Sequence, residues 1–323
     1  MAEVQLTLSE QQLMQRVAQA YFDTLLSADT LSALKSQQVA VTEALASAQA
    51  RFKEGDVAVI DTHETQARYD LLASQALEAE SNLQLSRAAL ADMTGNQDAE
   101  LVSLPQKAKL PSTMGGDLQS WLMRAKSNHP SIHAQQLQEE IAHAESGKFQ
   151  AKFSPVVNLV AMAGGDHLQG LRVNDADVTN RQMSLGVQLT IPLYSGGMRE
   201  ARYQEAIALE EGARNQTEFV RQQAAREVRA AWLATTTGQG QITALEQAER
   251  SAEIKLDSTR LGRDVGDRTT LDVLYSEQEL YNTRLALYRS RYQTLLAQLN
   301  LSAAVGELNE ARLQEINQLF TSQ

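Results

Sequence analysis

Large side chains recur alternately three and four residues apart in the last third of the chain, which is the heptad spacing of helices that pack side by side. The residues of this seam are Leu274, Gln278, Tyr281, Leu285, Tyr288, Tyr292, Leu295 and Leu299, and a second seam holds Leu280, Leu287, Ala297 and Leu301. Two seams on one helix predict a neighbouring helix on each side. A similar seam occurs earlier, at Tyr69, Leu72, Ala76, Ala79, Leu83, Ser86, Leu90 and Met93.

Each of these segments follows a long stretch without proline, at about residues 6–52 and 197–265. At a rise of 1.5 Å per residue, the second stretch predicts a helix roughly 100 Å long. Without further information, an ordinary antiparallel coiled coil explains this pattern as well as a closed wall of helices does.

Residues 183–191 follow a different period. Five apolar side chains, from Met183 to Ile191, alternate with polar or small ones, as in a strand with one apolar and one polar face. We expect a partner strand at residues 155–163 and a polar surface loop at 164–182. Pro192 should end the strand, and Gly196-Gly197 should permit the change of direction into the long helix. Such a hairpin suits a tilted transmembrane ribbon, although a hairpin on a soluble helical protein has the same pattern.

The two helical halves match without gaps when the second is placed 211 residues after the first. Gly55-Asp56 then corresponds to Gly266-Asp267, Asp61 to Asp272 and Gly95 to Gly306. We therefore expect an internal duplication. The predicted division is a first helical repeat at 1–104, a linker with a helix at 105–152, a β-hairpin at 153–195 and a second helical repeat at 196–323.

Composition narrows the possible partners. The chain has 40 acidic and 29 basic residues, a net charge of −11 and no cysteine among its 323 residues. An acidic chain repels phosphate backbones, so nucleic acid is not expected as a partner. The absence of cysteine excludes thiol catalysis and thiolate metal sites within this chain.

Motifs of enzyme chemistry are weak. Gly238-Gln239-Gly240 lacks the third glycine of a dinucleotide fingerprint and lies within a helical stretch. His129, His133 and His143 fit a solvated helix surface better than a metal site. We expect no catalytic residue, metal or cofactor.

The start of the chain conflicts with a membrane location. Met1-Ala2-Glu3-Val4 has neither the basic start nor the apolar core of a signal peptide, and no apolar stretch approaches the roughly 20 residues of a spanning helix. Taken alone, these features favour the cytosol.

Four segments, in this order and at this spacing, resemble the TolC family of trimeric outer-membrane efflux and secretion ducts over nearly the whole chain. Residues 54–61 and 265–274 look like the two helical tips. Residues 125–130 look like the start of the helix that leads into a hairpin, and residues 191–197 look like the strand-to-helix junction.

The resemblance implies a mainly α fold with a β-hairpin, in which long antiparallel helices form a periplasmic α-barrel and the strands join an outer-membrane β-barrel. It also implies a passive homotrimer in the outer membrane and periplasm. Its expected partners are a periplasmic adaptor, an inner-membrane transporter of the RND or ABC type and outer-membrane lipid. The alternative function is a soluble coiled-coil scaffold or adaptor.

The resemblance also assigns roles to residues. Asp272 looks like an aspartate ring at the inner constriction, with Tyr275 where the family often has a second acid. Asp61 and Arg268 match a pair that locks the tips, and Arg263 replaces a tyrosine of that network and could pair with Asp61 or Asp264. The expected adaptor-docking tips are Gly55, Asp56, Val265, Gly266 and Asp267, and the strand–helix junction is Pro192, Gly196 and Gly197. The alternative interpretation of Asp61, Arg268 and Asp272 is ordinary solvated surface charge.

One departure from the family is large. Its members carry two hairpins per chain, whereas the first repeat here lacks a counterpart of residues 117–195. Three copies would supply six strands where the family implies twelve. We expect the sequence to be a truncated piece of a longer protein, with a divergent mode of assembly as the alternative.

Overall fold

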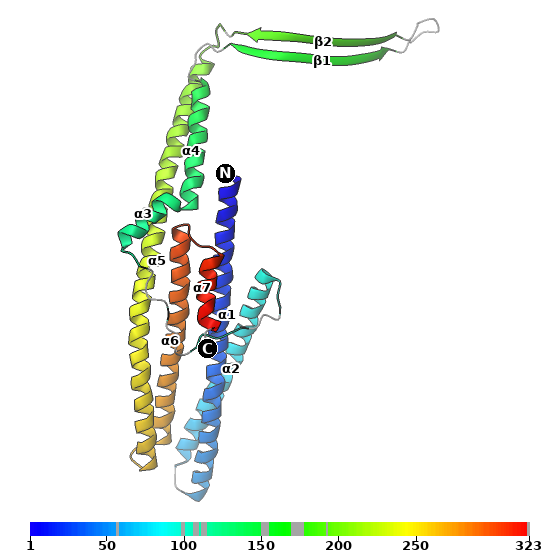
Figure 1. Ribbon diagram of the computed structural model, residues 1–323. Helices are drawn as coiled ribbons and strands as arrows, with labels where there is room; N and C mark the ends of the chain where they lie inside the picture. The colour runs from blue at the N-terminus through cyan, green and yellow to red at the C-terminus, as the bar shows by residue number, and fades with distance from the viewer. Residues whose placement is uncertain are drawn as a thin grey trace. The chain divides into compact units, whose positions relative to one another are not determined.

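The computed structural model describes residues 1–55, 58–97, 101–105, 110, 115–149, 155–168, 178–191 and 193–321. Its elements are α1 (Ala2–Glu54), α2 (Val59–Thr94), α3 (Leu118–Asn128), α4 (Pro130–Phe149), β1 (Val156–Leu168), β2 (Val178–Thr190), α5 (Met198–Asp264), α6 (Thr270–Ala304) and α7 (Glu310–Thr321). This is the expected mainly helical fold with a single described hairpin (Figure 1). The chain divides into two compact units, one of residues 1–134 and 220–323 and one of residues 135–219. The four predicted domain boundaries remain a prediction.

The first unit contains two long helical hairpins, α1–α2 and α5–α6 (Figure 1). Each hairpin turns at a glycine in the left-handed region, at Gly55 with φ of 84° and at Gly266 with φ of 83°. Each also ends at such a glycine, at Gly95 with φ of 70° and at Gly306 with φ of 74°. These are the glycines that coincide at the offset of 211 residues, and their conformation is one that other residues adopt only with strain.

Side chains at matching positions also have matching environments. Thr24 and Thr235 are both buried, and their hydroxyls donate to the carbonyl oxygens of Ala20 and Ala231 at 2.6 and 2.9 Å. Other pairs of buried residues stand at the same offset, among them Leu31 with Ile242 and Leu90 with Leu301. The two hairpins therefore resemble each other in packing as well as in sequence.

The main core lies where α1, α6 and α7 meet. Leu25, Leu295 and Leu299 are almost fully buried there, and each contributes on the order of 1.5–3 kcal/mol through apolar burial. The rings of Phe22 and Tyr292 stack with their centroids 5.9 Å apart. The heptad seams of α6 predicted this burial. The seam predicted for α2 is buried only in part, because Leu72, Ala79 and Leu90 are buried but Met93 is exposed.

A polar cluster joins residues 101–105 to this core. Tyr292 donates its hydroxyl to Asp29 Oδ2 at 2.6 Å, and Ser103 Oγ donates to Asp29 Oδ1 at 3.2 Å. Burial raises the pKa of the Asp29 carboxyl, and the two hydrogen bonds partly offset that effect.

Charged pairs join α5 to α6 along their length. Arg284 bonds Glu249 at 2.8 Å and Glu253 at 2.5 Å, and the buried Arg291 bonds Glu246 at 2.9 Å. A close helix contact lies beside them, because a Cβ on Gly238 would meet Thr294 Oγ1 at 2.3 Å. Gly238 therefore has a packing role, and the nearby Gly240 has no atom within 4 Å of such a Cβ.

Helix α3 packs on the end of the α5–α6 hairpin. Its buried Trp121 and Ala125 contact Val228, Leu301 and Val305. The following corner is tight, since a Cβ on Gly306 would meet the Asn128 carbonyl oxygen at 2.3 Å. Residues 125–130, expected to start the helix that leads into the hairpin, contain the end of α3, the corner at His129 and the first residue of α4, Pro130. The helix that leads into the hairpin therefore starts within the expected segment, and Pro130 at its first turn separates it from α3.

The second unit contains α4 from residue 135 onward, the hairpin and the first part of α5. Ser146 Oγ of α4 donates to Glu210 Oε2 of α5 at 2.5 Å, and His143 Nδ1 lies 2.7 Å from Glu210 Oε1. These two bonds lower the pKa of the Glu210 carboxyl.

The strands pair antiparallel in register from Val156 opposite Thr190 to Leu168 opposite Val178. They are longer than predicted, because residues 164–168 and 178–182 belong to the ribbon and were expected in a loop. Main-chain hydrogen bonds hold a hairpin together whatever the polarity of its side chains, so the polar and glycine-rich sequence concealed this extension. Among the described residues no helix combines the length and the apolar character needed to cross a membrane.

Candidate functional site

The second helical tip, between α5 and α6, contains most of the predicted site. Two backbone hydrogen bonds to the same oxygen form the turn. The N–H groups of Asp267 and Arg268 donate to the Gly262 carbonyl oxygen at 2.8 and 3.2 Å. A Cβ on Gly262 would meet Arg268 Cγ at 2.7 Å, so the stem of Arg268 lies against this glycine. The expected docking residues Val265, Gly266 and Asp267 are exposed on this turn.

Asp272 caps helix α6. Its Oδ2 accepts from the Thr269 N–H at 2.9 Å and from Thr269 Oγ1 at 3.0 Å, and its own N–H donates to Thr269 Oγ1 at 3.1 Å. This reciprocal arrangement is a capping box. The bond from the Thr269 N–H, then the one from its hydroxyl, and the nearby Arg268 charge lower the pKa of the Asp272 carboxyl, so the carboxylate is ionised at neutral pH.

Asp61 holds the matching position at the first tip, but its surroundings differ. Helix α2 begins after Ala58, which supplies no side-chain cap. In the described part of the chain, the Asp61 carboxylate makes no ion pair or hydrogen bond. Gly55 forms the turn, while Asp56 lies outside the described residues.

Arg263 pairs with Asp264, one of the two partners expected for it. Its Nη2 lies 2.7 Å from Asp264 Oδ1, and its Nε donates to the same oxygen at 3.1 Å. No ion pair between Asp61 and Arg268 is formed within the described ranges of a single chain.

Tyr275 is 66% exposed near the tip and lies close to Arg68 of α2. Burial lowers the pKa of the Arg68 guanidinium, and the interaction with Tyr275 partly offsets this. Arg68 Nη2 is buried, and among the described residues it has no hydrogen-bond partner. Sequence reasoning missed Arg68, because a single arginine within a polar helix gives no signal of its burial.

The β1–β2 ribbon is the second candidate surface. Cross-strand partners share a face, and four such pairs are apolar throughout: Val157–Leu189, Leu159–Val187, Ala161–Leu185 and Ala163–Met183. Their large side chains are exposed, with Leu185 at 77% and Met183 at 89%. The opposite face includes Asn158 with Gln188 and Gly164 with Gln182.

The ribbon joins α5 through the predicted glycine pair. Gly196 and Gly197 have φ of 58° and 83°, and α5 begins at Met198. Pro192 lies outside the described residues. Within those residues no cluster of three or more metal-ligating side chains occurs.

Comparisons with known proteins agree with this architecture. The sequence pattern of the outer membrane efflux protein family matches residues 1–96 and 121–307. The outer membrane protein TolC of Escherichia coli is 29% identical over 316 residues, which are 95% of this chain and 64% of that protein. The proteases secretion protein PrtF of Dickeya chrysanthemi is 29% identical over 318 residues, covering 97% of this chain and 68% of the relative.

The fold also matches solved structures. The outer membrane protein VceC of Vibrio cholerae superimposes with a TM-score of 0.74 at 23% identity, over 94% of this chain and 72% of the other. The chain therefore spans about two thirds of the length of these relatives.

Proposed function

The chain belongs to the outer membrane efflux protein family, and from that premise we propose that it is part of a passive trimeric channel-tunnel for efflux or type I secretion. Three copies surround one tunnel. The long helices form its periplasmic wall, and the ribbon of each copy lies in the outer membrane. An inner-membrane RND or ABC transporter supplies the energy, and a periplasmic adaptor joins that transporter to the helical tips.

The apolar face of the ribbon is the observation that carries this proposal. Leu159, Leu185 and Val187 are each more than 70% exposed on a ribbon whose opposite face bears Asn158 and Gln188. A soluble protein rarely exposes so continuous an apolar surface, whereas lipid on one side and water on the other requires it. No finding favours the alternative of a soluble scaffold.

The tips support the proposed gate. Asp61 and Arg268 are charged, lie at matching ends of the two hairpins and form no ion pair with each other within one chain. In a trimer the tips of neighbouring copies approach, so a bond between copies can hold the tunnel closed. Asp272 adds three carboxylates near the same constriction, which favours the passage of cations over anions.

A charged residue introduced on the apolar face of the β1–β2 ribbon tests the proposal. Leu185→Arg places a cation on the apolar face, at a cost of roughly 2–4 kcal/mol at the bilayer midplane. The variant is expressed, as part of the natural protein, in a strain from which the gene has been deleted. We expect the variant protein to be lost from the outer-membrane fraction, and the strain to remain drug-sensitive or defective in secretion. Gln188→Arg, on the other face of the same strand, is the matched control and should behave as the unaltered protein does.

Two results would count against it. One is that Leu185→Arg protein remains in the outer membrane and supports transport in full. The other is release of the unaltered protein from cells without detergent, which is the behaviour of a soluble scaffold.

A further inference from the structure

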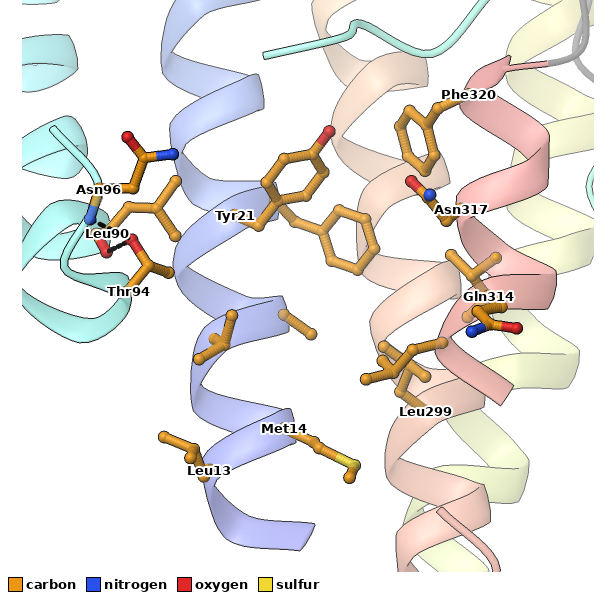
Figure 2. A pocket seen from close by; sticks show the side chains of 15 residues that line it. Leu13, Met14, Tyr21, Leu90, Thr94, Asn96, Leu299, Gln314, Asn317 and Phe320 are labelled. Carbon is orange, nitrogen blue, oxygen red and sulfur yellow. Dashed lines mark hydrogen bonds between the residues drawn. The ribbon is translucent and has the colours of Figure 1, made fainter. Parts of the chain in front are cut away.

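An arginine interrupts the buried stripe of helix α2. The stripe consists of Thr65, Leu72, Ala79 and Leu90, which are all buried. Figure 2 shows the last of them, Leu90, at the end of α2 facing α1. Arg68 stands three residues after Thr65 and four before Leu72, so it lies on the same face of the helix. A neutral side chain would continue this stripe without burying a charge.

This part of α2 packs on the beginning of α6. Leu72 of α2 and Leu274 of α6 belong to one buried cluster. The Arg68 guanidinium lies close enough to Tyr275 for the two side chains to interact electrostatically. Arg68 therefore lies beside the first two turns of α6, which also carry Asp272.

The charge of Arg68 has no counter-charge in its own chain as far as the structure describes it. Its Nη2 is buried without a hydrogen-bond partner, and the guanidinium forms no ion pair with any described residue. Arginine stays protonated at physiological pH, and salt screens a partly buried charge less than an exposed one. The surface of α6 beside Arg68 is therefore subject to a permanent positive potential.

Asp272 and Arg68 bring opposite charges to the same end of α2 and α6. The carboxylate of Asp272 is ionised at neutral pH, and its two hydrogen bonds come from the uncharged Thr269. In the proposed lock, Asp61 and Arg268 cancel each other. That leaves the three carboxylates of Asp272 in a trimer, and three Arg68 guanidinium groups oppose them.

From this arrangement we infer that Arg68 sets the charge selectivity of the tunnel. Its guanidinium offsets the Asp272 carboxylates, so cargo with carboxylate or phosphate groups passes the constriction as well as cationic cargo does. Without Arg68 the carboxylates would hold such anions back. The inference rests on the proposed channel function.

Reversal potentials in planar bilayers test the inference. The protein as it occurs in the cell is compared with its Arg68→Gln variant across a gradient of KCl. We expect the permeability ratio of K⁺ to Cl⁻ to rise about threefold or more in the variant, because the positive charges leave the constriction. Asp272→Asn should lower the ratio below that of the unaltered protein, and the double variant should return close to the unaltered value.

Three further variants separate charge from other effects. Arg68→Lys keeps the charge and should keep the ratio. Arg87→Gln removes an exposed arginine near the other end of the same helix and should also keep it. Arg68→Met is a second neutral variant, whose flexible apolar side chain fills the space of the arginine stem if glutamine disturbs the packing. Single-channel conductance verifies that each variant has assembled.

The inference fails if Arg68→Gln and Arg68→Met conduct with the ratio of the unaltered protein, or if Arg68→Lys changes the ratio as much as Arg68→Gln does. A rise in conductance without a change in the ratio would assign Arg68 to a contact between copies, and would overturn it as well. In each of these cases the protein still conducts, so the channel function holds while the selectivity role of Arg68 is lost.

Discussion

Thr269 and Asp272 bond each other in both directions at the start of α6. The Asp272 N–H donates to Thr269 Oγ1 at 3.1 Å, and the Thr269 N–H donates to Asp272 Oδ2 at 2.9 Å. The first tip has Ala58 in place of the threonine, so Asp61 has no such bond and α2 begins without a side-chain cap. Two aspartates at matching positions thus differ in their local role: Asp272 caps its helix, and Asp61 does not.

Ala58→Thr should build the missing cap at the first tip. Because Asp61 already stands three residues further on, a hydroxyl at 58 completes the capping pattern, and we expect α2 to gain about 1 kcal/mol. Hydrogen exchange of the amides of residues 59–62 measures this as slower exchange. Ala58→Val adds similar bulk without a hydroxyl and should give no protection. Equal protection by both variants would show that the cap is not the cause.

Thr269→Val should have the opposite effect at the second tip. It removes a hydroxyl that both accepts from and donates to Asp272, so the start of α6 should lose about 1 kcal/mol and fray. Hydrogen exchange of residues 270–273 should accelerate, while α2 remains unchanged. No change at these amides would mean that packing of Val273 and Leu274 alone fixes this end of the helix.

Acid should weaken the second tip. The bonds from Thr269 lower the pKa of the Asp272 carboxyl below its ordinary value of 3.8. A carboxyl with a lowered folded-state pKa stabilises the folded form fully above its unfolded pKa, and this contribution is lost as the pH falls through the folded value. Asp272→Asn should therefore reduce the loss of stability below pH 3.8, measured by urea unfolding at a series of pH values. An identical acid profile in both proteins would contradict this.

Much of the fold was predictable because it rests on local periodicity. The seams of α6 and the glycines at 55 and 266 follow from spacing that a helix imposes. The spacing of Thr269 and Asp272, three residues apart, is also typical of a capping box, whereas the resemblance to the family implies a role for Asp272 in the gate. Helix α7 was missed because its stripe of Leu313, Ile316 and Phe320 is only three turns long and resembles a continuation of the preceding repeat.

Other features depend on contacts between distant segments, and no local pattern reveals them. The burial of Arg68 beside Tyr275 exists only because α2 and α6 lie together, more than 200 positions apart in sequence. Likewise, the sequence around Gly238 shows only an incomplete nucleotide motif, and its packing against Thr294 depends on the contact between α5 and α6.

Gly238→Ala and Gly240→Ala should act in opposite directions. A methyl group at 238 would lie 2.3 Å from the buried Thr294 Oγ1, so the two helices must separate and we expect a loss of about 1–3 kcal/mol. At 240 the space is open, and alanine should stabilise the helix by about 0.5–1 kcal/mol. Chemical unfolding of both proteins tests this, and destabilisation by both substitutions to the same extent would show that the close approach has no role.

The last prediction concerns the proposed lock between Asp61 and Arg268. Since Asp61 and Arg268 form no ion pair within one chain, a lock between them must join different copies of the trimer, and it should act as one interaction. Asp61→Asn and Arg268→Gln should each raise single-channel conductance severalfold in planar bilayers, and the double variant should conduct no more than either single variant. Low salt should make the difference larger, because ions screen exposed pairs. Asp92→Asn, at the opposite end of α2, is the control and should leave conductance unchanged. Additive effects would assign the two residues to separate interactions, and unaltered conductance in both would remove the lock.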